Sequence, residues 1–260
     1  MTPSRATSAA VMARALLAAF GLLLAAAISP ARADMSRSCR VPDALLAFDA
    51  RLTRISRLVD HSLPVRILRI RTFQEGPGTG SLNSELTRRL PDVPFTIIEE
   101  YPQPGDAEDD FAQIRTAIDE TDPDLVIWQL GTGDVLAATD LDAFSQTIED
   151  AADWIERRDV DLVLVDPPFV PNVSHERLYR RISRWIDAIS SRERMNVVNQ
   201  YDVTHYLLSN LAVVTPTASP SSPPSADSAR EASLVPSPAP ARPNCMTELM
   251  AEAIVRAATR

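Results

Sequence analysis

The sequence predicts a three-layer α/β domain built around a five-stranded parallel sheet. Short apolar segments alternate five times with amphipathic segments between residues 42 and 199, which is typical of strands joined by right-handed helical crossovers. The segment Leu125–Leu130 is continuously apolar except for Gln129, as expected for a strand covered by helices on both faces. It ends in the turn Gly131-Thr-Gly133, and ligands of parallel α/β proteins bind at such carboxyl ends.

The spacing of apolar residues predicts each element in turn. Steps of three and four residues, as at Leu141, Phe144 and Ile148, indicate a helix with one buried face. Short runs rich in Val, Ile and Leu indicate strands. The acids at 106–110 and Asp140 favour helix starts through the helix dipole and capping. We therefore expect helices at 42–59, 82–90, around 111–118, 141–155, 178–189 and 246–258, and strands at 65–70, 95–98, 125–130, 160–165 and 196–199.

Both ends of the chain and one internal segment lie outside the alternating pattern. Residues 1–33 carry Arg5 and Arg14, then an apolar stretch from Ala15 to Ile28, then small residues, which is the order of a cleavable secretory signal. The apolar stretch is short for a membrane span, although an uncleaved anchor is the alternative. Residues 213–243 are rich in Pro, Ser and Ala and predict a disordered loop. We expect a signal peptide at 1–33, the α/β domain at 34–212, the loop at 213–243 and the closing helix of the same domain at 244–260, in a periplasmic or secreted protein without a membrane span after cleavage.

Charge and cysteine content narrow the classes of function. The chain has 26 basic and 35 acidic residues, and removing residues 1–33 with their three arginines changes the net charge from −9 to 23 − 35 = −12. Such an acidic protein has no electrostatic reason to bind nucleic acid. Cys39 and Cys245 predict a disulfide in an exported protein, with two unrelated buried thiols as the alternative. The three histidines, at 61, 175 and 205, show no ligand spacing, so we expect neither a metal site nor a cofactor.

Four segments resemble one known family. Asp124-Leu-Val-Ile-Trp-Gln-Leu-Gly-Thr132 with Gly133 is similar to the third sequence block of the SGNH/GDSL hydrolases, which usually reads Gly-x-Asn-Asp or Gly-Thr-Asn. Cys39–Asp49, Asp161–Pro168 and Cys245–Ile254 resemble the leader helix, the fourth strand and the closing helix of a bacterial exported subgroup. The resemblance implies a flavodoxin-like strand order of 2-1-3-4-5 and an ester-hydrolase ancestry.

The resemblance also implies where catalytic residues would stand. These enzymes attack esters with a serine that follows the first strand, but here the only hydroxyl near that position belongs to Thr72. They stabilise the oxyanion with backbone N–H groups and an asparagine side chain. Gly105 aligns with the glycine of that oxyanion hole, and Gly133 stands where the family has its asparagine.

The family's Asp-x-x-His motif, which precedes the closing helix, has no counterpart at residues 235–243. The segment Asp202-Val-Thr-His205 has the right internal spacing but follows the last strand directly. There it is also explained as a helix start, with Asp202 as the capping residue. Serine, asparagine and histidine are therefore all absent from their expected places.

These absences predict an exported protein with an ester-hydrolase scaffold and a degenerate catalytic centre. It would act by binding an envelope glycan, an acyl-ester ligand or a protein partner. One alternative is a weak or specialised esterase that uses Thr72 or a rearranged Asp202/His205 pair. A second alternative is a structural component of the cell envelope. Whether Thr72 and His205 approach each other separates the first two hypotheses.

Overall fold

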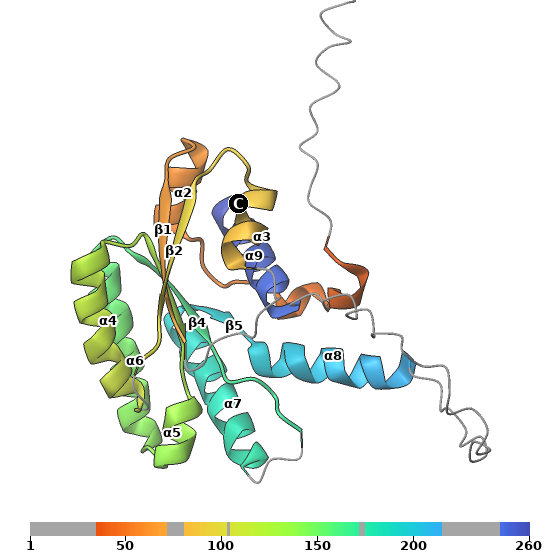
Figure 1. The fold of residues 1–260 in the computed structure, drawn as a ribbon. Helices are drawn as coiled ribbons and strands as arrows, with labels where there is room; N and C mark the ends of the chain where they lie inside the picture. The colour runs from red at the N-terminus through yellow and green to blue at the C-terminus, as the bar shows by residue number, and fades with distance from the viewer. Residues whose placement is uncertain (1–34, 72–80, 103–104, 172–174, 215–244) are drawn as a thin grey trace, which may run out of the picture. The chain divides into compact units, whose positions relative to one another are not determined.

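Five parallel strands form one sheet in the order β2-β1-β3-β4-β5 (Figure 1). The computed structural model describes residues 35–71, 81–102, 105–171, 175–214 and 245–260. The predicted signal peptide, residues 72–80 and nearly all of the Pro/Ser/Ala-rich segment lie outside these ranges. The strands are β1 Val65–Ile70, β2 Phe95–Glu100, β3 Leu125–Gln129, β4 Asp161–Val165 and β5 Asn196–Val198. This order and the parallel pairing confirm the predicted fold class.

Helices cover both faces of the sheet (Figure 1). Successive side chains of a strand point to opposite faces, so Ile67 and Ile127 pack on one side while Leu68 and Trp128 pack on the other. The first side carries α2 Thr53–Asp60, α3 Leu82–Arg89 and α9 Cys245–Ala258, and the second carries α4 Ala107–Thr121, α5 Thr132–Ala137, α6 Leu141–Glu156 and α7 Glu176–Glu193. A further helix, α8 Gln200–Val214, follows β5.

The predicted helix over 42–59 is wrong in its first part. The structure has only a single 3-10 turn at Asp43–Leu45, and α2 begins at Thr53. The apolar residues that suggested a long helix are nevertheless buried, including Leu46, Phe48 and Leu52. The spacing of apolar residues in this segment therefore predicted correctly which side chains are buried. It predicted the backbone conformation of residues 46–52 incorrectly.

Hydrogen bonds from distant strands explain this difference. The N–H of Ala50 donates to Oδ1 of Asn196 on β5 at 2.9 Å, and the N–H of Ile55 donates to Oδ2 of Asp161 on β4 at 2.9 Å. Asp161 thus acts as a helix cap supplied from another part of the chain. Because these partners lie more than 100 residues away, no local pattern could place the helix start.

The predicted disulfide is confirmed. Cys39 and Cys245 are bonded through their sulfur atoms and join the 3-10 turn Arg37–Cys39 to the first residue of α9. The bond links segments 206 residues apart. In the part of the chain that the structure describes, no helix combines the length and apolar character needed to cross a bilayer.

Candidate functional site

The predicted site lies where β1 and β3 pair, at their carboxyl ends. The chain leaves β1 toward β2 on one side and returns to β3 on the other. Ligands of open parallel sheets bind at such a reversal of strand order. Gly105 immediately precedes the start of α4, and Gly133 lies in the first turn of α5, directly after β3. The fold therefore brings these two sequence-predicted positions together.

Gly105 and Gly133 are packed backbone against backbone. A Cβ atom at Gly133 would lie 1.6 Å from the carbonyl oxygen of Gly105 and 2.8 Å from its carbonyl carbon, whereas real Cβ atoms essentially never come closer than 3.0 Å to other heavy atoms. Position 133 thus admits no side chain unless the backbone at Gly105 moves. The atom beside it is a hydrogen-bond acceptor, whereas an oxyanion hole requires donors.

Gly131 adds a second steric constraint to the same turn. Its φ is +89°, a left-handed conformation that favours glycine. A Cβ atom here would lie 2.7 Å from Cγ2 of Ile182 on α7 and 3.0 Å from Cγ of Pro167. The turn after β3 is consequently held between α7 on one side and the start of α4 on the other.

Asp134 ties the start of α5 to the start of α4. Its carboxylate is 3% exposed and accepts a hydrogen bond from the N–H of Ala107 at 3.0 Å. Burial raises the pKa of Asp134, and the bond from Ala107 opposes that rise. Nearby, burial raises the pKa of Asp110 to about 6 although its carboxylate accepts from Nε1 of Trp128 at 3.1 Å. Both acids have structural partners in the helix-start region.

Two buried arginines lie at the carboxyl end of β1. Arg69 and Arg71 are each 6% exposed, and alternation along the strand puts them on the same face. Their Nη1 atoms lie 3.3 and 3.5 Å from the two carboxylate oxygens of Glu99 on β2. One carboxylate therefore joins both guanidinium groups and links the ends of two neighbouring strands.

The remaining predicted residues do not join this site within the described structure. Thr72 lies outside the described residues. Asp202 and His205 are exposed in the first turns of α8. That helix follows β5, and its first residue, Gln200, accepts a hydrogen bond at 3.3 Å from Nε2 of Gln129 at the end of β3. His205 packs edge-on against Phe169, with ring centroids 4.8 Å apart, and among the described residues no hydrogen bond or ion pair joins it to Asp202.

A family model described as the non-GDSL lipase-like family matches residues 38–260. The chain belongs to this family. The sequence-based expectation of an SGNH/GDSL-like hydrolase family is therefore confirmed, and the family's description agrees with the absence of a Gly-Asp-Ser turn after β1. Fold and family together establish an ester-hydrolase lineage, whereas activity depends on the site.

The solved structures that match this chain at low identity include esterases. A variant of Axe2, an acetyl-xylooligosaccharide esterase from a Geobacillus species, is 14% identical over 75% of this chain and 94% of that chain, with a TM-score of 0.49. TesA is 18% identical over 52% and 77% of the two chains, with a TM-score of 0.43. At these values neither structure supports an argument about site residues. A search of curated protein sequences finds no significant match.

Sequence reasoning missed one buried polar cluster of this family member. Asp166 follows β4 directly, is 1% exposed, and accepts hydrogen bonds from the hydroxyl of Ser183 on α7 and from the N–H of Tyr201. Burial raises the pKa of Asp166 to about 7. An acid directly after an apolar strand could have indicated Asp166 as a candidate site residue. Nothing in the sequence distinguishes Ser183 from other polar residues on the same helix. Only the fold brings the two together.

The described residues contain no recognisable metal-binding site. No group of three or more His, Cys, Asp or Glu side chains among them is close enough together to hold a metal ion. The site near Gly133 thus contains the backbone contact with Gly105 and the carboxylates of Asp134 and Asp110, which already accept hydrogen bonds. It also contains two buried arginines that pair with Glu99. None of these groups is a nucleophile.

Proposed function

We propose that this protein is an exported member of an ester-hydrolase lineage whose catalytic centre no longer hydrolyses esters and which acts by binding in the cell envelope. The observation that carries the proposal is the contact between Gly133 and the carbonyl oxygen of Gly105. Losing one oxyanion donor costs about 10²–10³ in rate in enzymes that are otherwise intact. Here the donor is absent, and an acceptor occupies the space beside its position.

The location of His205 also supports the proposal. A general base must reach its nucleophile directly or through one water molecule. His205 packs against Phe169, and among the described residues no hydrogen bond or ion pair joins its ring to Asp202 or to a hydroxyl group. The proposed location in the envelope rests on the signal-like residues 1–33 and on the disulfide, which is typical of oxidising compartments.

Hydrolysis of p-nitrophenyl acetate and butyrate tests the loss of catalysis. The mature chain from Asp34 is compared with its Thr72→Ala and His205→Ala variants, with circular dichroism confirming that all three are folded. We expect equal background rates. Turnover that either substitution abolishes would contradict the proposal and support the alternative of a specialised esterase.

A fluorophosphonate probe tests for a nucleophile at any position, including Ser183. The probe forms a stable adduct with an activated serine, which intact-mass spectrometry detects without knowledge of the substrate. We expect no adduct on the folded protein, while an authentic serine esterase treated in parallel is fully labelled. A stoichiometric adduct on one peptide would identify an active nucleophile and overturn the proposal.

A further inference from the structure

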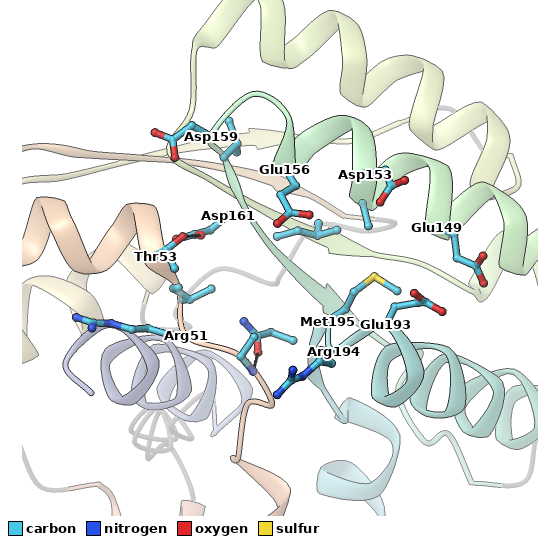
Figure 2. A pocket seen from close by; sticks show the side chains of 16 residues that line it. Arg51, Thr53, Glu149, Asp153, Glu156, Asp159, Asp161, Glu193, Arg194 and Met195 are labelled. Carbon is cyan, nitrogen blue, oxygen red and sulfur yellow. Dashed lines mark hydrogen bonds between the residues drawn. The ribbon is translucent and has the colours of Figure 1, made fainter.

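The cavity shown in Figure 2 has most of its charges paired within the protein. It measures about 630 Å³ and lies at the amino-terminal ends of β4 and β5. Six acids line it, but Arg192 contacts two of them, and Arg54 and Arg57 both pair with a third. A cationic ligand would therefore compete with arginines that the protein itself supplies.

A smaller cavity, between α7 and the start of α8, is built differently. It measures about 150 Å³. One wall is a single face of α7, where the lining residues are spaced at i, i+3, i+4 and i+7. The other wall is the turn from β5 into α8. The residues of α7 are Arg180, Ser183, Arg184 and Asp187, and those of the turn are Asn199, Tyr201 and Asp202.

Two of the lining residues are buried. Ser183 is 8% exposed and Tyr201 is 6% exposed. The hydroxyl of Ser183 donates to Asp166, and the hydroxyl of Tyr201 donates to Glu176 at 2.7 Å. These partners fix both side chains, so the cavity has a rigid inner wall that reaches below the protein surface.

The charged side chains of this cavity have opposite signs but are not paired with one another. Two arginines and two aspartates line it, so its formal charge is 2 − 2 = 0. Arg184 and Asp187 are three residues apart on α7, a spacing at which ion pairs form on helices, yet no ion pair joins them in the structure. Their side chains and that of Asp202 have no hydrogen bond or ion pair with any described residue. Arg180 pairs with Glu176, at 3.4 Å.

Asn199 adds a neutral polar group to the same space. Its side chain lines the cavity and has no hydrogen bond with any described residue. An amide side chain offers both donors and an acceptor. The cavity thus presents positive, negative and neutral polar groups whose partners the described part of the chain does not provide.

The volume limits the size of a ligand. One water molecule needs about 10–15 Å³ of cavity volume on the same measure. A cavity of about 150 Å³ therefore holds a ligand of roughly ten non-hydrogen atoms. Free amino acids are of this size, whereas a peptide of several residues is too large.

We propose that this cavity binds a small zwitterion of the α-amino acid class. The carboxylate of the ligand accepts hydrogen bonds from the guanidinium group of Arg184, a pairing that is strong because it can be bidentate. The ammonium group of the ligand donates to Asp187 and Asp202. A ligand with a single charge would leave the opposite charges of the cavity unpaired. The proposal does not depend on whether ester hydrolysis has been lost, because the cavity shares no residue with the turn at Gly133.

Thermal unfolding of the purified full chain tests the proposal with the common free amino acids, each at millimolar concentration. A ligand that binds only the folded state raises the midpoint of unfolding. We expect at least one amino acid to raise it. The N-acetyl derivative and the primary amide of that amino acid each lack one of its two charges, and we expect neither to raise the midpoint.

The variants Arg184→Gln and Asp187→Asn test the two ends of the site separately. Both side chains are exposed, so we expect the variants to fold. Isothermal titration calorimetry with the stabilising amino acid should show about tenfold weaker binding in each variant, the usual effect of losing one charge-assisted hydrogen bond. The matched controls are Arg177→Gln on α7 and Asp150→Asn on α6, which are exposed outside the cavity. They should change the affinity less than about twofold, because solvent and salt screen distant surface charges.

Three results would overturn the proposal. The first is that no amino acid stabilises or binds the wild-type chain. The second is that the N-acetyl derivative or the amide binds as tightly as the free amino acid, which would mean that the cavity recognises only one charge. The third is that both cavity variants bind as tightly as their controls.

Discussion

Gly133 permits the observed backbone packing and, in the proposed function, leaves no side-chain donor where the family has its asparagine. We predict that Gly133→Asn does not restore activity and lowers the free energy of unfolding by about 1–3 kcal/mol, the usual cost of forcing extra atoms into a packed site. The reason is the 1.6 Å approach of its Cβ to the carbonyl oxygen of Gly105. Urea denaturation and p-nitrophenyl acetate hydrolysis measure the two effects.

Ala137→Asn is the matched control for this substitution. Ala137 is exposed at the end of the same helix, α5, so the change should cost less than about 1 kcal/mol through helix propensity alone. Unchanged stability of Gly133→Asn, or esterase activity gained by it, would show that the contact yields readily and that the oxyanion position remains usable.

We predict that the free energy of unfolding depends on pH through Asp166. Burial raises its pKa from 3.8 to about 7 in the folded state, so the folded chain binds more protons than the unfolded chain between about pH 4 and 7. Stability must therefore fall as the pH rises through that window, and the loss is complete above it. Nearby Asp202 acts in the same direction, whereas bonds from Ser183 and Tyr201 oppose it.

The Asp166→Asn variant tests this assignment, because an amide does not titrate. Urea unfolding at pH 5 and pH 8 should show a smaller loss of stability in the variant than in the wild type. Some loss remains, because burial also raises the pKa of Asp110 to about 6. An identical difference between the two pH values in both proteins would mean that Asp166 is ionised throughout.

At the scale of the element, α2 depends on a cap that the sheet provides. Asp161 accepts from the N–H of Ile55 at 2.9 Å. We predict that Asp161→Ala destabilises the protein by about 0.5–2 kcal/mol, as for the loss of other helix caps, and speeds hydrogen exchange of the amides in α2. Asp150→Ala, at an exposed position of α6, is the control. Full protection of α2 in Asp161→Ala would assign its start to local sequence instead.

The disulfide acts on the whole molecule. Replacing both Cys39 and Cys245 by serine should lower the free energy of unfolding by roughly 2–5 kcal/mol, because the bond closes a loop across 206 residues and restricts the unfolded chain. Chemical denaturation measures the change, and reduced wild type should match the variant. Equal stability of the oxidised and reduced proteins would mean that the packing of α9 alone closes the domain.

The sequence predicted most elements because their signals are local. The strand candidates at 65–70 and 125–130 became β1 and β3 with ends shifted by at most one residue. The helix over 42–59 failed because Asn196 and Asp161 bind its backbone from distant strands. Within the site, the pattern identified Gly105 and Gly133 but not their contact, and it identified neither Asp166 nor its partner Ser183.

The sequence by itself determined the number of strands, through short-range periodicity, and the family, through motifs that reside in residue identity. The family resemblance in turn implied the strand order and showed that serine, asparagine and histidine are absent from their usual places. Only the tertiary structure placed the carbonyl group of Gly105 against Gly133, the ring of His205 against Phe169, and the carboxylate of Asp166 beside Ser183. Each of these depends on distances between segments far apart in the chain, which only the packing of helices on the sheet establishes.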